Sequence, residues 1–312
     1  MRKENSKKKL VILLLLLLLT TGCTKTLTDK NKEPVKNEVT GQNLTENILC
    51  RPNNKNVIKI YKKNGVDVEK LPKCSDFKVN SGKYEGLWTG LFVKPLAFIL
   101  LKLGELLNNN YALSLIIISL IIRLIAFPFT KKTAMQSELM KKAQPELNRI
   151  QNKYKNKQDQ ESLTRQSQEM MAVYKKYNIS PMSGCLFSMI QLPLFIGFFE
   201  AVQRIPAIFE GKFLGLQLGT TPIVGFTTSA MIAYVILMIL ISVTTYFSFR
   251  FNLADNTLDS SMKMMPVMMV GMIIVMALFM PSALGIYWIT TNLFTIVQNI
   301  LVKRSKVVNG KK

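Results

Sequence analysis

The sequence predicts an all-α membrane protein with five transmembrane helices in its mature part. Hydrophobic residues make up 48% of the 312 residues, and yet the formal net charge is +22. Multi-spanning membrane proteins with basic loops combine these two properties, and soluble domains rarely do. Arg123 lies inside the apolar run 111–130, where a guanidinium stays charged at a cost of about 3 kcal/mol. A charge in such a place is a candidate functional group.

Composition excludes several classes of active site. The chain contains no histidine, which removes histidine triads, histidine general bases and most zinc sites. It contains neither a GxxxxGK[ST] phosphate loop nor a dinucleotide-binding fingerprint. We therefore expect no cofactor, no metal and no nucleotide hydrolysis. The basic residues are spread over tails and loops, which favours anionic lipid, ribosomal RNA or control of topology as their purpose.

The first 22 residues predict a lipoprotein signal peptide. A basic stretch precedes the unbroken apolar run Leu10–Leu19. Thr20-Thr21-Gly22-Cys23 then resembles the lipobox of bacterial lipoproteins, in which the cysteine is lipidated and becomes the first mature residue. The pattern is imperfect, because threonine occupies the position where leucine is preferred. The alternative is an uncleaved anchor helix, and either interpretation exports the residues that follow.

Residues 23–86 predict an exported, lipid-anchored polar segment. Lys, Asn, Asp and Thr are frequent in it and aromatic residues are few, which indicates a flexible segment with short strands, for example at Asn56–Tyr61. Cys50 and Cys74 form an even pair in an exported region, and a disulfide is the expected state there. Two free thiols are the alternative.

Residues 87–107 are apolar but contain two lysines, a proline and a glutamate. They fit either a poor span or an amphipathic helix at the outer interface, with Trp88 as an interfacial anchor. The next long connection, residues 131–180, decides between them, because its eleven Lys/Arg against five acidic residues favour the cytoplasm. Residues 111–130 are therefore the first mature span, and residues 87–107 lie on the outer surface.

Residues 131–180 predict a cytoplasmic hairpin of two amphipathic helices, with a break near residues 152–160. Pro145 predicts a kink or a restart in the first arm. Apolar residues, among them Leu139, Leu147 and Val173, recur at helical spacing. The hairpin is either a solvated structure with an internal seam or a docking surface for acidic or RNA-bearing partners, and the two are compatible.

Four further spans and their connections complete the predicted topology. The spans are residues 181–202, 222–249, 264–280 and 283–302, joined by an outer loop at 203–221 and a cytoplasmic loop at 250–263. The basic tail 303–312 agrees with a cytoplasmic C-terminus after five crossings. The predicted location is a bacterial cell membrane, with the N-terminal lipid anchor on the outer side.

Several strings of residues occur in a characteristic order. They are Ile121-Ile122-Arg123-Leu124 with Pro128, Gln144-Pro145-Glu146, Ser183-Gly184-Cys185-Leu186, Met189-Ile190-Gln191-Leu192-Pro193, and Gly285-Ile286-Tyr287-Trp288-Ile289. Together they cover residues 85–305 and resemble the YidC/Oxa/Alb family of membrane protein insertases, in the lipoprotein form of Gram-positive bacteria. Residues 24–86 lie outside the resemblance.

The resemblance implies five helices around a hydrophilic groove that is open to the cytoplasm and to lipid but closed toward the outside. Arg123 matches the arginine of the family's groove. The further candidates for the groove are Gln191, Tyr287, Trp288, Thr290, Thr291 and Asn292. The implied function is the insertion of nascent membrane proteins into the lipid bilayer, alone or with the Sec translocon. A ribosome is the expected partner of the hairpin and the tail, and no small-molecule substrate is expected.

Each candidate residue has a simpler alternative. Arg123 can snorkel to the cytoplasmic interface, because its side chain is long and the end of the helix is near. The amide and hydroxyl side chains can form ordinary hydrogen bonds between helices, and Tyr287 and Trp288 can simply pack. Two rival functions also remain. One is a small transporter or channel in which Arg123 binds an anionic solute, and the other is a lipoprotein scaffold that docks ribosomes.

Overall fold

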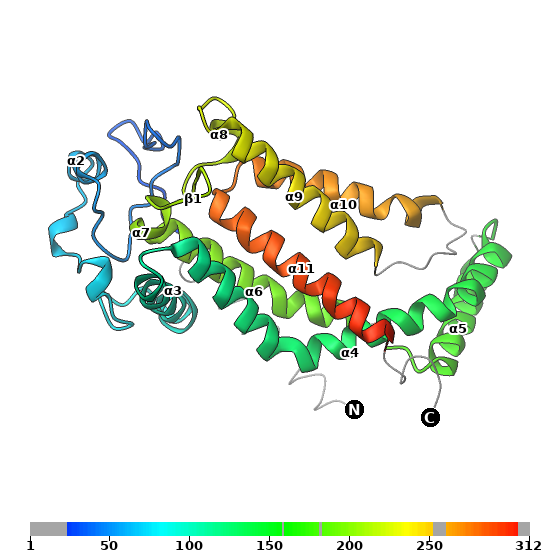
Figure 1. Ribbon diagram of the computed structural model, residues 1–312. Helices are drawn as coiled ribbons and strands as arrows, with labels where there is room; N and C mark the ends of the chain where they lie inside the picture. Colours follow the sequence, from blue (N-terminus) through cyan, green and yellow to red (C-terminus); the bar gives the residue numbers. More distant parts are fainter. Residues whose placement is uncertain (1–23, 158, 181–182, 252–259, 305–312) are drawn as a thin grey trace. The chain divides into compact units, whose positions relative to one another are not determined.

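The structure is a computed structural model that describes residues 24–157, 159–180, 183–251 and 260–304. These residues are mostly helical, and Figure 1 follows them along the chain. The elements are α2 (Lys55–Lys63), η1 (Val68–Lys70), η2 (Cys74–Asp76), η3 (Thr89–Val93), α3 (Lys94–Leu106), α4 (Tyr111–Tyr154), α5 (Gln160–Lys176), α6 (Ser183–Arg204), α7 (Pro206–Phe209), β1 (Lys212–Phe213), β2 (Leu216–Gln217), α8 (Pro222–Gly225), α9 (Met231–Arg250), α10 (Ser260–Leu278) and α11 (Ser282–Arg304).

The chain forms two compact units, and the long helices contribute to both. The first unit draws its described residues from Met1–Ile118, Leu192–Met238 and Met276–Tyr287. The second unit draws its described residues from Ser119–Gln191, Ile239–Val275 and Trp288–Lys312. The predicted signal peptide with Cys23, most of the connection 250–263 and the end of the basic tail lie outside the described residues.

Residues 55–63 form helix α2, so the prediction of a strand at residues 56–61 is wrong. The start of the helix explains the difference, because the side-chain oxygen of Asn54 accepts a backbone hydrogen bond from the residue two positions on, at 2.9 Å. Val57 and Tyr61 are buried one helical turn apart. Their spacing, which also fits a short strand, belongs to the inner face of a helix.

The prediction that residues 24–86 are flexible is also wrong, because this segment has a hydrophobic core. Tyr61 lies in it with its hydroxyl donating to the carbonyl oxygen of Thr45 at 2.9 Å. The buried members of the core are Leu27, Leu44, Ile48, Val57, Tyr61, Val68 and Phe209. Phe209 comes from α7 in the predicted outer loop. Residues 24–86 are therefore packed against that loop within the first unit.

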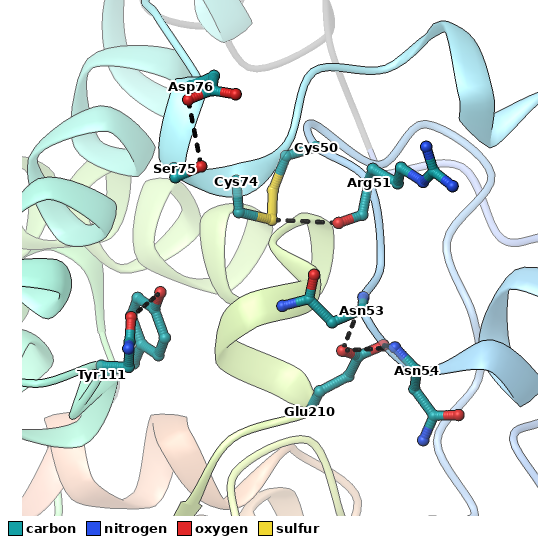
Figure 2. The surroundings of a disulfide bond; sticks show 10 residues. Cys50, Arg51, Asn53, Asn54, Cys74, Ser75, Asp76, Tyr111 and Glu210 are labelled. Carbon is teal, nitrogen blue, oxygen red and sulfur yellow. Dashed lines mark hydrogen bonds between the residues drawn. A yellow bond between two sulfur atoms is a disulfide. The ribbon is translucent and has the colours of Figure 1, made fainter.

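A disulfide joins Cys50 and Cys74 in this segment. Figure 2 shows its surroundings, where Asn53 and Asn54, shortly after Cys50, lie beside Glu210. The carboxylate of Glu210 accepts hydrogen bonds from the backbone N–H groups of Asn53 and Asn54, at 3.2 and 3.3 Å. Burial raises the pKa of Glu210, and these two hydrogen bonds oppose that rise. The disulfide and the Glu210 contacts together fix residues 50–54.

Replacing both Cys50 and Cys74 by serine is expected to destabilise residues 24–86 by about 2–4 kcal/mol, because a cross-link restricts the unfolded chain. The measurement is the rate at which trypsin cleaves this lysine-rich segment in the detergent-solubilised protein. Cys185→Ser is the matched control, since it removes a thiol and leaves the disulfide intact. Equal cleavage rates in the double variant and the control would contradict a stabilising role.

A buried group of charges joins the segment of residues 24–86 to α6 and to the residues before α3. The Arg204 cluster consists of Arg204, Asn47, Glu85, Trp88 and Glu200. Arg204 is 0% exposed, and its Nε donates to the carbonyl oxygen of Asn47 at 2.7 Å. Its Nη2 atom lies 2.6 Å from Glu85 Oε2, and its Nη1 atom lies 3.9 Å from Glu200 Oε2. A buried ion pair such as Arg204 with Glu85 is tolerated inside a protein only when the opposite charges are close together and hydrogen-bonded.

The prediction that Trp88 is an interfacial anchor is wrong. Its side chain is 3% exposed, and its indole N–H donates to Glu200 Oε1 at 2.9 Å. The residues that are exposed near it are apolar instead, with Leu91 64% and Ile99 51% exposed. Helix α3 nevertheless has one apolar exposed side and one buried side, as an interfacial helix requires.

Helix α4 is a single α-helix of 44 residues that continues through Pro128 and Pro145. The predicted restart at Pro145 is therefore absent. Its C-terminal part and α5 share a hydrophobic core whose buried members are Ala143, Leu147, Ile150, Tyr154, Val173 and Ile179. Exposed ion pairs join the two helices, for example Lys176 Nζ to Glu146 Oε2 at 2.8 Å. The predicted internal seam of the hairpin corresponds to this core.

Three helices in the described residues are long and apolar enough to cross a bilayer, namely α4, α9 and α11. Helix α6 covers the predicted second span, and the apolar part of α10, Val267–Leu278, lies in the predicted fourth. The five-span topology itself stays a prediction. One boundary differs from expectation, because residues 222–249 do not form one helix. The short helix α8 ends at Gly225 and α9 begins at Met231.

Candidate functional site

Arg123 lies on α4 in the second unit, and it is half-buried. The helix face beside it is apolar and exposed, with Leu124 61% and Ile125 71% exposed. Phe129, further along the same helix, is 67% exposed. An exposed apolar face on a membrane-capable helix is the side that contacts lipid. The guanidinium is therefore on the border between the lipid-facing surface and the interior of the unit.

The interior of the second unit is rich in hydroxyl and amide groups. Within residues 119–130 of α4, 239–249 of α9 and 288–302 of α11, the buried polar residues are Ser119, Thr130, Thr244, Thr245, Ser248, Thr290, Thr291, Gln298 and Asn299. Most of the exposed large residues in these stretches are apolar, namely Leu120, Ile121, Leu124, Ile125, Phe129, Ile239, Leu240, Val243, Phe247, Leu293, Val297 and Leu301. This distribution is the reverse of a soluble bundle. It produces a polar interior inside an apolar surface.

Two hydrogen bonds tie the polar interior together. The side-chain amide of Asn292 on α11 donates to Thr245 Oγ1 on α9 at 3.0 Å. The hydroxyl of Thr130 on α4 donates to Gln298 Oε1 on α11 at 2.9 Å. Asn292 therefore makes an interhelical hydrogen bond of the kind given as its alternative, and its place in the groove stays a prediction. No role in the polar interior was expected for Thr130, Thr245 or Gln298. The sequence feature that could have indicated one is that each is a polar residue in or next to an apolar span.

The other predicted residues divide between the two units. Gln191 and Trp288 are half-buried and belong to the second unit with Arg123. Thr291 is buried, and its hydroxyl donates to the carbonyl oxygen of Trp288 at 3.0 Å. Tyr287 belongs to the first unit.

Tyr287 takes part in an aromatic cluster of the first unit. Its ring centroid is 4.5 Å from that of Phe198 and 6.3 Å from that of Phe195. The side chain is 4% exposed. Such a ring contributes packing between α6 and α11. The structure therefore gives Tyr287 a packing environment, and its predicted place in the groove stays a prediction.

A family model described as "60Kd inner membrane protein" matches residues 102–309. "Membrane protein insertase MisCA" of Bacillus subtilis is 36% identical over 217 residues, which are 69% of this chain and 79% of that protein. "Membrane protein insertase YidC 2" of Listeria innocua is 34% identical over 218 residues, which are 70% of this chain and 72% of that protein. "Membrane protein insertase YidC" of Oceanobacillus iheyensis is 32% identical over 70% of this chain and 85% of that protein.

A solved structure illustrates the similarity in fold. It is described as "Active YidC insertase crystal structure with the first transmembrane domain resolved", and it matches with a TM-score of 0.52 and 22% sequence identity. The match covers 81% of this chain but only 54% of that chain, so this chain spans about half of the solved protein. The family model covers more than half of the present sequence, and the relatives are of the Gram-positive type. The chain belongs to the 60Kd inner membrane protein family, which is the YidC/Oxa/Alb family of membrane protein insertases.

Proposed function

We propose that this chain is a membrane protein insertase that receives hydrophilic segments of nascent membrane proteins in a positively charged groove around Arg123. The observation that carries the proposal is the half-buried Arg123 on α4, in the same unit as the buried hydroxyl and amide groups of α9 and α11. A guanidinium inside a bilayer is stable only among polar groups or water. We propose that Gln191, Trp288, Thr291 and Asn292 line the groove with it.

The depth of Arg123 fits this role. It stands seven residues before Thr130, which is roughly 10 Å along a helix. If Thr130 marks the cytoplasmic end of the span, the charge lies in the cytoplasmic half of a hydrocarbon core about 30 Å thick. A client segment that enters a groove of this depth has less hydrocarbon left to cross. Arg123 attracts acidic residues in that segment, and no covalent step is involved.

The membrane potential then favours the onward movement of acidic residues toward a positive outside. Its contribution is about 2.3 kcal/mol per charge per 100 mV. The client's apolar helix leaves the groove sideways into lipid. This mechanism uses a fixed charge and a polar surface, which is why it requires neither a cofactor nor nucleotide hydrolysis.

The same proposal includes topology and partners. We propose that Cys23 anchors the chain to the outer leaflet and that Lys303 and Arg304 lie on the cytoplasmic side. The hairpin of α4 and α5 carries an excess of lysine and arginine, which suits a ribosome as its partner. Cooperation with the Sec translocon is the remaining part of the proposal, and it rests on the family alone.

The test is insertion of a Sec-independent client into liposomes that contain only the purified full-length chain. We expect protease protection of the client's translocated segment in these liposomes and none in empty ones. A chain that fails to insert any client while it conducts an anionic solute would be a transporter or channel instead. A chain that binds ribosomes but neither inserts clients nor conducts solutes would be a scaffold.

A further inference from the structure

A short β-hairpin in the loop between α6 and α9 presents a leucine at its tip. Strands β1 and β2 pair antiparallel, with Phe213 opposite Leu216. The turn between them consists of Leu214 and Gly215, with φ values of +47° and +82°. Two-residue turns of this kind favour Asn, Asp and Gly, because other side chains are strained at positive φ. Leu214 is nevertheless 81% exposed, so neither backbone preference nor burial within the chain accounts for a leucine there.

The hairpin is fixed to the beginnings of two membrane-capable helices in the first unit. The backbone N–H of Gln217 donates to the hydroxyl of Tyr234 on α9 at 3.1 Å. The first two residues of α11 donate backbone hydrogen bonds to the carbonyl oxygens of Thr220 and Leu218, at 2.9 and 3.0 Å. Leu218 is itself buried. The position of the tip relative to both helix ends is therefore set by hydrogen bonds and packing.

The tip lies at the level where α9 begins. A Cβ atom placed on Gly215 would be 3.5 Å from the Cβ of Ala233, in the first turn of α9. Tyr234 stands three residues after Met231, the first residue of the helix, which is about 4.5 Å along the helix axis. The hairpin therefore lies beside the first turn of α9 and does not project beyond its end.

The neighbouring face of α9 is apolar and exposed. Met231 is 48% exposed and Ile232 is 70% exposed. Ala233 follows Ile232 at about 100° around the helix, so the hairpin packs at the border of this face. The exposed Leu214 therefore lies near the exposed apolar residues at the start of α9. Lys212, at the base of the hairpin, is exposed and can reach the headgroup region.

We propose that Leu214 is a lipid anchor, and that the hairpin tip inserts into the interfacial region of the leaflet at the N-terminal ends of α9 and α11. The occupant of the apolar tip is lipid, because the tip lies near the exposed apolar residues at the start of a helix that is long enough to cross the bilayer. This role is independent of client insertion, since it fixes the depth of two helix ends in the membrane.

The direct test is Leu214→Trp in the full chain, reconstituted into phosphatidylcholine and phosphatidylglycerol vesicles with brominated acyl chains. The emission added by the new tryptophan, after subtraction of the wild-type signal, is expected to shift to shorter wavelength and to be mostly quenched by the bromines. Lys59→Trp is the matched control, because Lys59 is exposed on α2 opposite Val57. Its added emission is expected to remain unquenched. Quenching of the Leu214→Trp emission by aqueous iodide instead of bromolipid would overturn the proposal.

A second variant covers the case in which tryptophan disturbs the turn. Asparagine is well suited to positive φ, so Leu214→Asn should leave the melting temperature in detergent unchanged or raised. In vesicles, trypsin should cleave after Lys212 faster in this variant than in the wild type, whereas the two rates should be equal in detergent. Equal rates in vesicles as well would contradict lipid anchoring. Neither experiment contains a client protein, so the outcome of each is independent of whether the chain has insertase activity.

Discussion

An Arg204→Met variant is expected to lose about 3–5 kcal/mol of unfolding free energy, which is the typical result of removing one partner of a buried ion pair. Arg204 is fully buried, and its guanidinium lies 2.6 Å from Glu85. Methionine fills a similar volume but leaves Glu85 and Glu200 as neighbouring carboxylates with no cation between them. The hydrogen bond to the carbonyl oxygen of Asn47 is lost as well. Residues 24–86 should therefore detach from α6.

The measurement is thermal unfolding in detergent, together with the rate of trypsin cleavage in residues 24–86. Arg51→Met is the matched control, because Arg51 also pairs with a glutamate, Glu69, but in a half-exposed setting. That variant should lose about 1 kcal/mol or less. Adding Glu85→Gln to Arg204→Met should recover part of the loss, since it removes one of the unpaired charges. Equal losses in Arg204→Met and Arg51→Met would show that the Arg204 cluster does not hold the segment in place.

Arg123→Ala is expected to reduce the insertion of clients with acidic translocated segments about tenfold more than that of clients with neutral segments. Two unit charges about 4 Å apart attract by about 1 kcal/mol in water and about 4 kcal/mol at an effective dielectric constant of 20. A wet groove lies between these limits, and 1.4 kcal/mol corresponds to a factor of ten. The measurement is liposome insertion of matched client pairs that differ only in the charge of that segment.

Two further variants define the interpretation of the Arg123 experiment. Arg123→Lys should retain most of the activity, because the proposed attraction needs a positive charge and no bidentate geometry. Arg149→Ala removes the same charge from the same helix at an exposed position of the hairpin, and it should leave the client preference unchanged. If Arg123→Ala impaired acidic and neutral clients equally, the charge-pairing mechanism would be wrong while a structural role of Arg123 would remain.

Apolar runs and the family resemblance predicted the membrane-capable helices, and the helical spacing of apolar residues predicted the seam of the hairpin. Both features are local properties of the sequence. Leu147 and Val173 were expected on the inner side of the hairpin, and both are in its core. Partners that are distant in sequence could not be predicted in this way. Trp88 is buried, and its indole N–H donates to Glu200, which is 112 residues away in the sequence. Nothing in the residues around Trp88 indicates that contact.

The errors in residues 24–86 have a similar cause. Polar composition predicted flexibility, but the core of this segment is completed by Phe209 of α7, a helix in the predicted outer loop. Asn54 decides helix over strand at α2 through a single capping hydrogen bond. Within the candidate site, the sequence shows which polar residues interrupt the apolar spans, but their pairing, such as Thr130 with Gln298, depends on the packing of helices.

The continuity of α4 has a mechanical consequence. From Arg123 to the end of the helix at Tyr154 the backbone is helical without interruption, so one helix carries both the candidate site and the first arm of the hairpin. A torque applied to the hairpin by any bound partner is transmitted along this one rod. Pro128 is the point of least bending stiffness near the site, because proline lacks the N–H that would hydrogen-bond to the preceding turn. That point lies five residues from Arg123, so the guanidinium stands close to the fulcrum of the rod, where a large swing of the hairpin produces only a small displacement.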